Sequence, residues 1–355
     1  MHVGIDELEH LAMGAAVFGA GGGGDPLMGH LLAKRSVETH GPAQLVQLEE
    51  LDDDALIIPA AMVGAPTVMA EKFAAGDEGD RLKDAMEQQL GRPVAALCLA
   101  ELGGLNGVLP FMWAARSNLP VVDCDLMGRA FPELQMTTAA LAGIEISPCL
   151  VTDERGNMVS FTTITPEWSE TLVRTLVGAM GGAASLTLYP MTVAQAKTAV
   201  VPKSVTRAIE VGRVLLEASD DPVAALCAEV DGIRLIQGKV VDVDRQTADG
   251  FARGSATIEG TGVDAGRTVR MEFQNENALV IEDGHVRASV PDIITAVDVH
   301  TARPIVTEAL RYGQRVTLIA LPCDPVWRTD KALAVVGPRA FSYDIDYVPV
   351  EELHA

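Results

Sequence analysis

The first half of the chain alternates short apolar runs with segments of helical periodicity. Apolar residues recur at helical spacing within residues 6–18, and Pro26 after Asp25 predicts a second helix with Asp25 as its N-cap. Strands that alternate with helices indicate a mainly parallel sheet covered on both faces. The pattern predicts strands over residues 45–48, 55–63, 94–100 and 120–124, and further helices over residues 66–75, 79–90 and 104–117.

The pattern changes after residue 148. Residues 149–164 predict two strands around a polar turn, a β-hairpin that closes the first domain. The remainder of the chain becomes rich in short strands between turn clusters, which indicates a β-dominated α+β domain. Helices are predicted over residues 167–181 and 203–219, and strands over residues 184–188, 233–243, 254–259, 268–273, 278–281 and 316–321.

The chain length and the change from an alternating helix–strand pattern to a strand-rich pattern together predict two different domains in an α/β protein. A chain of 355 residues exceeds the size at which a single core keeps growing. We expect residues 1–165 to form an N-terminal, mainly parallel α/β sandwich, and residues 166–355 to form a C-terminal β-rich α+β domain. The sequence shows no repeat and no low-complexity linker, so the halves are expected to share an interface, where ligand sites commonly lie.

Composition restricts the partners and the compartment. The formal net charge of −22 opposes binding to nucleic acid and to anionic membranes, and no apolar run reaches the roughly 18 residues that cross a bilayer. The N-terminal sequence MHVGIDELEHL lacks a secretory pattern, and five cysteines without a CxxC pair predict reduced thiols in the cytoplasm. We expect a small-molecule substrate with a carboxylate as the partner, and a homo-oligomer is one allowed assembly.

The segment VVDCDLMGRAFPE, residues 121–133, holds the first candidate chemistry. A buried strand there delivers Asp123, Cys124 and Asp125 to its carboxyl end, the edge at which ligands bind in open α/β sheets. Buried carboxylates cost several kcal/mol unless partners or a ligand offset them, which favours a functional interpretation. In the structural alternative, Asp125 caps the next helix and Asp123 pairs with Arg129.

A second strand end, CLAELGGLNG at residues 98–107, delivers Glu101 and Asn106. The two strand ends are expected to converge across one crevice, where neighbouring carboxylates raise one pKa and supply a general acid and a general base. The structural alternative is a helix cap at Glu101 and a loop-stabilising role for Asn106. We take Asp123, Cys124, Asp125 and Glu101 as the catalytic candidates.

Binding candidates lie in a glycine run and in three further segments. Gly21, Gly22, Gly23 and Gly24 resemble an anion cradle ahead of a helix, with a tight helix-to-helix turn as the equal alternative. ATP and NAD are disfavoured because the run lacks a P-loop ending and follows a helical pattern. Arg129 suits a carboxylate, and Glu133 suits the start of a helix. The other candidate binding residues are Asn106 and, at the ends of β segments of the second half, Glu276 and Asp292.

Metal binding has weak support in the sequence. The seven histidines form no HxH or HExxH pair. No cofactor is predicted with certainty. A zinc site made from Cys124, Asp123, Glu101 and one distant histidine is compatible with the sequence, because metal ligands can come from separate loops.

Several segments together resemble the S-methyl thiohydantoin desulfurase-like family, long described only as a domain of unknown function. They are GAGGGGDP, AELGGLNG, VVDCDLMGRAFPELQM, FQNENALV, VPDIITAVD and LRYGQRVTLIALP. The resemblance spans nearly the whole chain and implies an N-terminal α/β domain, a distinct C-terminal domain, and a border near residue 166. It implies hydrolysis at the sulfur-bearing ring carbon of an S-methyl thiohydantoin with a propionate arm, releasing methanethiol and leaving a hydantoin.

The predicted residues suit that chemistry in two ways. Asp123 or Asp125 can activate water, or Cys124 can attack directly, and we favour activated water because flanking carboxylates raise the pKa of a thiol. Arg129 or the glycine run would bind the carboxylate arm. The alternatives are a non-catalytic small-molecule binding or regulatory protein, a metal-dependent hydantoin-type hydrolase, and an enzyme whose cofactor phosphate occupies the glycine run.

Overall fold

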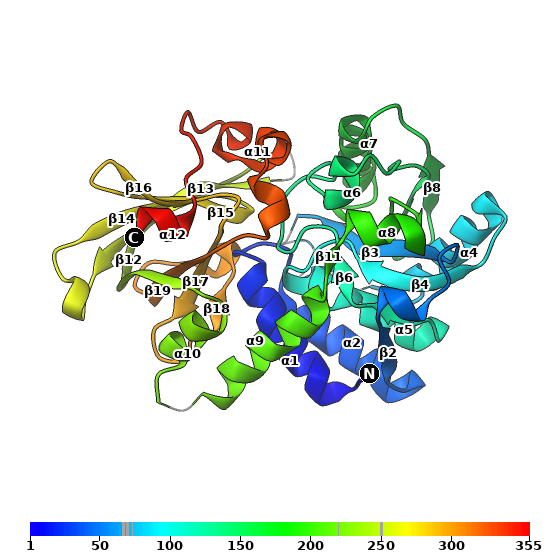
Figure 1. Ribbon diagram of the computed structural model, residues 1–355, viewed down its shortest axis with the longest axis horizontal. Helices are drawn as coiled ribbons and strands as arrows, with labels where there is room; N and C mark the ends of the chain where they lie inside the picture. The colour runs from blue at the N-terminus through cyan, green and yellow to red at the C-terminus, as the bar shows by residue number, and fades with distance from the viewer. Residues whose placement is uncertain (66–67, 69–70, 73, 219, 249–250) are drawn as a thin grey trace.

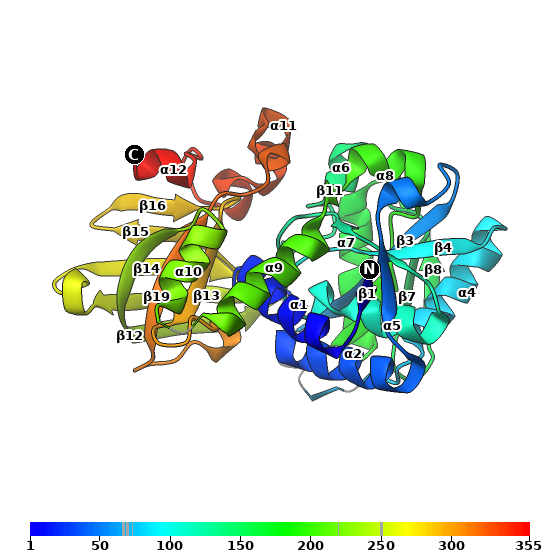
Figure 2. The same cartoon turned by 60° about the horizontal axis from the view of Figure 1, so that its bottom comes forward.

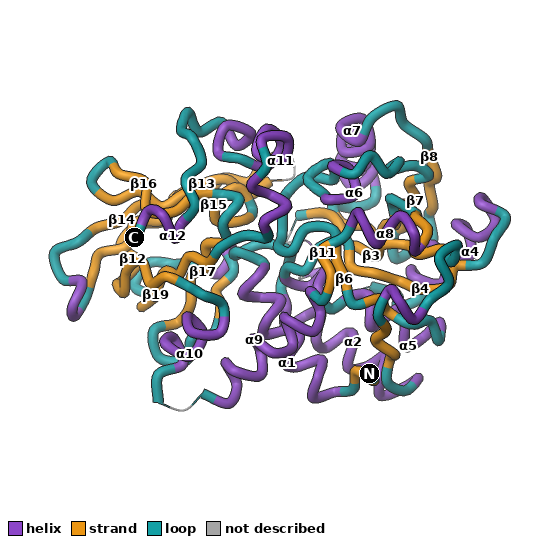
Figure 3. Tube along the Cα trace, viewed as in Figure 1, coloured by secondary structure: helices purple, strands orange, loops and turns teal. Residues whose placement is uncertain are grey.

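The computed structural model has two lobes, each built around its own β-sheet (Figure 1). It describes residues 1–355 except 66–67, 69–70, 73, 219 and 249–250. Figure 3 shows the strands gathered in two separate groups, with helices α1 (Ile5–Phe18), α2 (Pro26–His40) and α9 (Ser204–Glu217) near their junction. The two-domain α/β class predicted from the sequence is confirmed.

The first lobe contains a mixed nine-stranded sheet. Its centre is parallel, because β2 pairs with β5, β5 with β4, and β4 with β3 in the same direction. The flanking strands add antiparallel pairs on both sides. In sheet order the strands are β1 (His2–Val3), β2 (Ala43–Val46), β5 (Val121–Val122), β4 (Val94–Leu99), β3 (Leu56–Gly64), β9 (Ala183–Thr187), β7 (Cys149–Thr152) and β8 (Met158–Phe161), with β10 (Met191–Thr192) paired to β3.

Helices cover both faces of this sheet, as an alternating pattern requires. One apolar core contains side chains of α1, α2, α4 and α5, and a second core contains side chains of α7 and α8. Asp25 caps α2, as predicted, by accepting a 2.9 Å hydrogen bond from the Leu27 N–H. The remaining helices of this lobe are α4 (Glu78–Leu90), α5 (Leu109–Ser117), α6 (Thr138–Leu141), α7 (Pro166–Ala179) and α8 (Val193–Ala199).

Most predicted elements of the first half have counterparts in the structure. The strand over 120–124 is divided into β5 and β6 (Cys124–Asp125), and β6 pairs with β11 (Val201–Pro202) outside the main sheet. The hairpin predicted at residues 149–164 is the β7–β8 pair. The helix predicted over residues 66–75 lies largely outside the described residues.

The second lobe is an eight-stranded antiparallel sheet with a separate apolar core. Helix α10 (Pro222–Glu229) packs on this sheet, while α11 (Asp330–Val336) and α12 (Val350–Leu353) follow its last strand. In sheet order the strands are β16 (His285–Ser289), β15 (Glu276–Glu282), β14 (Thr268–Gln274), β13 (Phe251–Gly260), β12 (Ile233–Ala248), β19 (Arg315–Leu321), β17 (Ile293–Asp298) and β18 (Pro304–Ile305).

The predicted boundary at residue 165 does not separate the two sheets. Strand β9 pairs with β3 and β7, and β10 pairs with β3, so the first sheet continues to residue 192. The second sheet begins at residue 233 with β12. An isolated strand pattern does not reveal which sheet it joins, because long-range pairing decides this.

Helices α1 and α9 lie side by side between the lobes (Figure 2). Their backbones touch because glycine replaces a side chain at the crossing: a Cβ on Gly14 would overlap the Ala208 carbonyl, and a Cβ on Gly212 would overlap the His10 carbonyl. No helix in the described part of the chain is both long and apolar enough to span a membrane.

Candidate functional site

The glycine run interlocks with the loop that follows β4. A Cβ on Gly104 would lie 2.5 Å from the carbonyl carbon of Gly23, and a Cβ on Gly23 would overlap the Gly103 carbonyl. Hydrogen bonds continue the contact, since the Leu105 N–H donates to the Gly24 carbonyl at 3.3 Å. The glycines are therefore required where two backbones meet.

The same run also anchors the second lobe. The Asn277 N–H donates to the Ala20 carbonyl at 2.7 Å, and the Thr307 N–H donates to the Gly21 carbonyl at 2.9 Å. A Cβ on Gly22 would overlap the carboxyl group of Glu276. The absence of side chains thus lets a strand end of the second lobe approach the first sheet.

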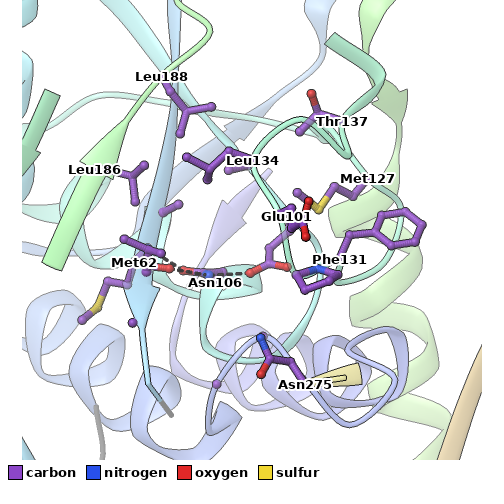
Figure 4. Close-up of a pocket in the computed structure, with 18 of the residues that line it drawn as sticks. Met62, Glu101, Asn106, Met127, Phe131, Leu134, Thr137, Leu186, Leu188 and Asn275 are labelled. Carbon is purple, nitrogen blue, oxygen red and sulfur yellow. Dashed lines mark hydrogen bonds between the residues drawn. The ribbon is translucent and has the colours of Figure 1, made fainter. Parts of the chain in front are cut away.

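A pocket of about 750 Å³, including its open mouth, lies at this junction. Figure 4 shows Glu101 and Asn106 on one side and apolar side chains around them. Gly23 and Gly24 border the pocket, and within the described chain neither of their N–H groups donates to a protein acceptor. The apolar lining includes Met62, Met127, Phe131, Leu134, Leu186 and Leu188, and the other polar lining side chains are Glu133, Thr137, Arg174, Asn275 and Glu276.

Asn106 fixes Glu101 within this pocket. Its side-chain amide accepts from the Met62 N–H at 2.7 Å and donates to the Met62 carbonyl at 2.9 Å, so the amide plane is held by strand β3. The same amide nitrogen donates to Oε1 of Glu101 at 2.5 Å. Oε2 of Glu101 has no hydrogen-bond partner within the described residues. Asn106 therefore positions one carboxylate oxygen, while the other is buried near the Phe131 backbone.

Burial gives Glu101 a pKa suited to proton transfer near neutral pH. Desolvation raises its pKa to about 7, the bond from Asn106 opposes this, and the Asp125 charge adds to the increase. A general base is most effective when its pKa lies close to the working pH. The side chain is 9% exposed, so only the pocket gives it access to solvent or ligand.

Asp125 lies behind Glu101 and does not line the pocket. Its Oδ2 accepts from the Met127 N–H at 3.0 Å and from the Gly128 N–H at 2.7 Å, and its Oδ1 has no partner in the described part of the chain. Burial raises the pKa of Asp125 to about 7, and the hydrogen bonds to Gly128 and Met127 oppose this increase. Asp125 is outside the pocket that Glu101 lines, although its charge contributes to the raised pKa of Glu101, and the catalytic role of Asp125 stays a prediction.

Asp123 is fully engaged in structural hydrogen bonds. Its carboxylate accepts from the N–H and the hydroxyl of Thr206 at 3.0 and 2.5 Å, and from the Gln47 amide at 3.0 Å. These bonds tie β5 to the first turn of α9 and to the segment after β2. Neither the ion pair with Arg129 that the sequence suggested nor a place in the pocket lining is found for Asp123.

Cys124 points into the apolar core on the α7–α8 face of the sheet. Its side chain is completely buried, and the neighbouring Cys98 thiol together with burial holds the pKa of Cys124 well above its ordinary value. A thiol in this state is a weak nucleophile. Its assignment as catalytic stays a prediction that the geometry does not favour.

Arg129 and Asp292 join the two lobes. Arg129 donates through Nη1 to the carbonyl groups of Pro291 and Asp292 at 2.6 and 2.9 Å, and burial lowers its pKa to about 10. The Asp292 carboxylate accepts from the Cys323 N–H, the Tyr347 hydroxyl and the Val350 N–H. Neither side chain lines the pocket: Arg129 joins the two lobes, and the Asp292 carboxylate holds the segments at Cys323, Tyr347 and Val350 together within the second lobe.

Glu133 and Arg174 also line the pocket. Glu133 accepts from the Gln135 amide, and burial raises its pKa with a further contribution from the Glu170 charge. Arg174 was not predicted from the sequence: it pairs with Glu170 at 2.5 Å and donates to the Pro132 carbonyl at 2.6 Å. Arg174 lies four residues after Glu170 on α7, a spacing that is typical of surface ion pairs on helices, so nothing in the sequence indicated a place in the pocket.

The structure does not assemble the predicted zinc ligands. Cys124 faces the core, Asp123 is occupied by Thr206 and Gln47, and Glu101 faces the pocket. Across the described residues, no group of three or more His, Cys, Asp or Glu side chains is arranged to hold a metal ion.

The fold and site define a class: a two-lobed α/β protein with a partly apolar small-molecule pocket that contains buried, incompletely paired carboxyl groups. Comparison with family models gives the family. The S-Me-THD-like N-terminal domain matches residues 6–163, and the S-Me-THD-like C-terminal domain matches residues 164–350. The chain belongs to the S-Me-THD-like family, which confirms the resemblance seen in the sequence.

Comparison with solved structures supports the fold. A crystal structure of a protein from Chromobacterium violaceum aligns with a TM-score of 0.83 and 22% sequence identity, covering 99% of this chain and 100% of that chain. At this identity the likeness establishes the shared fold alone. No curated protein matches the sequence significantly.

Proposed function

We propose that this protein is a hydrolase of small hydantoin-type rings, acting as an S-methyl thiohydantoin desulfurase in which Glu101 activates water. The observation that carries the proposal is the state of Glu101: Asn106 holds one of its oxygens, the buried side chain belongs to the pocket lining, and its pKa is about 7. Membership of the S-Me-THD-like family supports the class of substrate.

The lining of the pocket suits a substituted five-membered ring. Apolar side chains around a few convergent polar groups are typical of small-molecule sites. The side chains of Leu186 and Leu188 form an apolar wall that suits a methylthio group. The Arg174 guanidinium and the N–H groups of Gly23 and Gly24 suit an anionic arm.

The proposed first step is attack of water on the ring carbon that carries sulfur. Glu101 in its ionised form removes a proton from water through Oε2 as the oxygen bonds to carbon. Asn106 keeps Oε1 in place and so restricts the carboxylate to one orientation, which lowers the entropic cost of reaching the transition state. Cleavage of the carbon–sulfur bond then releases methanethiol and leaves a hydantoin.

The direct test is turnover of S-methyl thiohydantoins with different ring substituents. Released thiol is measured with a chromogenic disulfide, and the hydantoin product is identified by mass spectrometry. Glu101→Gln should lower kcat by about 10²–10⁴, the range for loss of a general base. Glu272→Gln is the matched control, because it changes a carboxyl that pairs with Arg270 outside the pocket, and it should retain most activity.

Two results would count against the proposal. Ligand binding without thiol release in the wild-type protein would favour the non-catalytic binding protein. Unchanged turnover in Glu101→Gln, with thermal unfolding similar to wild type, would show that another group activates the water.

A further inference from the structure

We infer that Glu276, supplied by the second lobe, is the second proton-transfer group of this site, so that the active site is complete only across the two lobes. This inference rests on the hydrolytic function proposed above. In this inference Glu276 delivers a proton to the ring nitrogen. The sequence pattern predicts a substrate-binding role for this residue.

Glu276 is the first residue of β15 and lines the pocket from the side of the second lobe. The preceding Asn275 has a left-handed backbone with φ of 58°, and its side chain accepts from the Ala252 N–H at 2.8 Å. Thr307 donates to the Asn275 carbonyl at 2.7 Å. These contacts fix the bend that brings the Glu276 carboxyl to the pocket.

The Glu276 carboxyl fits against the first lobe because residue 22 is a glycine and has no side chain. Glu276 occupies the space that a Cβ on Gly22 would need. It is 5% exposed, and its Oε2 has no hydrogen-bond partner among the described residues. A buried, unpaired carboxyl oxygen costs free energy in the folded protein, and a ligand that pairs with it offsets this cost.

The surroundings of Glu276 favour its protonated form. Burial raises its pKa well above the ordinary value, the Glu101 and Glu308 charges raise it further, and the Arg129 charge opposes them. Glu101, by contrast, keeps a hydrogen bond from Asn106 that stabilises its ionised form. Two carboxyls with different environments in one pocket correspond to an acid and a base.

The proton balance closes with these two groups. During attack, Glu101 takes a proton from water, the oxygen bonds to the ring carbon, and Glu276 gives its proton to the ring nitrogen as the C=N electron pair moves there. During collapse, Glu276 takes the hydroxyl proton, the C=O bond forms, the carbon–sulfur bond breaks, and Glu101 gives its proton to sulfur. Methanethiol and the hydantoin result, and both carboxyls return to their starting states.

The test compares Glu276→Gln with wild type and with Glu272→Gln, which changes a carboxyl outside the pocket. Glutamine can donate a hydrogen bond but cannot give up a proton, so kcat should fall by about 10²–10⁴. The dissociation constant of the hydantoin product, measured by calorimetry, should stay within about threefold. Thermal unfolding of each variant reports the fold.

The pH profile provides a measurement on the wild-type protein itself. Turnover should rise as Glu101 ionises near pH 7 and fall at higher pH as Glu276 loses its proton. The alkaline decrease should be absent from the residual activity of Glu276→Gln. Gly22→Ala, which displaces the Glu276 carboxyl without removing it, should reproduce the loss of kcat.

The outcomes separate the two proposals. Normal turnover in Glu276→Gln together with inactive Glu101→Gln would overturn the role of Glu276 and leave the hydrolase function standing. A wild-type profile without an alkaline decrease would also overturn it. Loss of product binding in parallel with kcat would reduce Glu276 to a binding residue. Normal turnover in both variants would overturn the proposed role of Glu101 as well.

Discussion

Replacing Glu101 with glutamine should stabilise the protein above neutral pH while it removes activity. Burial raises the pKa of Glu101 from its ordinary value of 4.5 to about 7. Between these pH values the folded protein keeps this proton, whereas the unfolded chain releases it. The folded state binds more protons, so the free energy of unfolding falls as the pH rises through this range and is constant above it.

The size of the effect follows from the same two values. The interval from 4.5 to about 7, at about 1.4 kcal/mol for each pKa unit, corresponds to about 3 kcal/mol. Glutamine carries no charge to desolvate and retains an oxygen that accepts from Asn106. The variant and the wild type should therefore have similar stability near pH 4.5, and the variant should be more stable by up to about 3 kcal/mol at pH 8.

Urea unfolding between about pH 5 and pH 8, followed by the fluorescence of buried Trp113 and Trp327, measures this difference. Asp123→Asn is the matched control, in which the free energy of unfolding should change in the opposite direction. Both Asp123 carboxylate oxygens are bonded, so an amide there should destabilise by about 1–3 kcal/mol. A stability difference between Glu101→Gln and wild type that does not change with pH would refute the reasoning.

Three further predictions test other parts of the site. Cys124→Ser should lower stability by about 1–3 kcal/mol, because it buries a hydroxyl in an apolar core. The variant should retain turnover below its melting temperature. A covalent adduct trapped on Cys124 of the wild-type protein would contradict this prediction. Asp125→Asn should move the acid limb of the pH–rate profile below pH 7, because the Asp125 charge raises the pKa of Glu101; an unmoved limb would exclude this coupling. Gly23→Ala should destabilise more than Gly143→Ala in urea unfolding, since their φ angles of 76° and 77° are alike but only Gly23 faces the Gly103 backbone; equal losses would leave backbone strain as the sole cause.

Local sequence patterns determined most secondary elements and the neighbourhood of the site. The rule that polar residues follow parallel strands placed Glu101 after β4 and Asp123 after β5, and β4 and β5 do pair in parallel, while Asp125 lies in β6 just beyond. The glycine run bordered the pocket for a reason that a sequence contains, namely that consecutive glycines permit close backbone approach. Periodicity and turn chemistry act over a few residues, so these features could be predicted.

Only the tertiary structure decided which buried acid is free to act. Asp123 and Glu101 look equivalent as acids after apolar strands. Thr206 of α9 and Gln47 occupy the oxygens of Asp123 outside the pocket, whereas Asn106 holds Glu101 in the pocket lining. Likewise Glu276 reaches the pocket because the second lobe docks on Gly22. Hydrogen-bond satisfaction and desolvation depend on partners far apart along the chain, and folding brings those partners together.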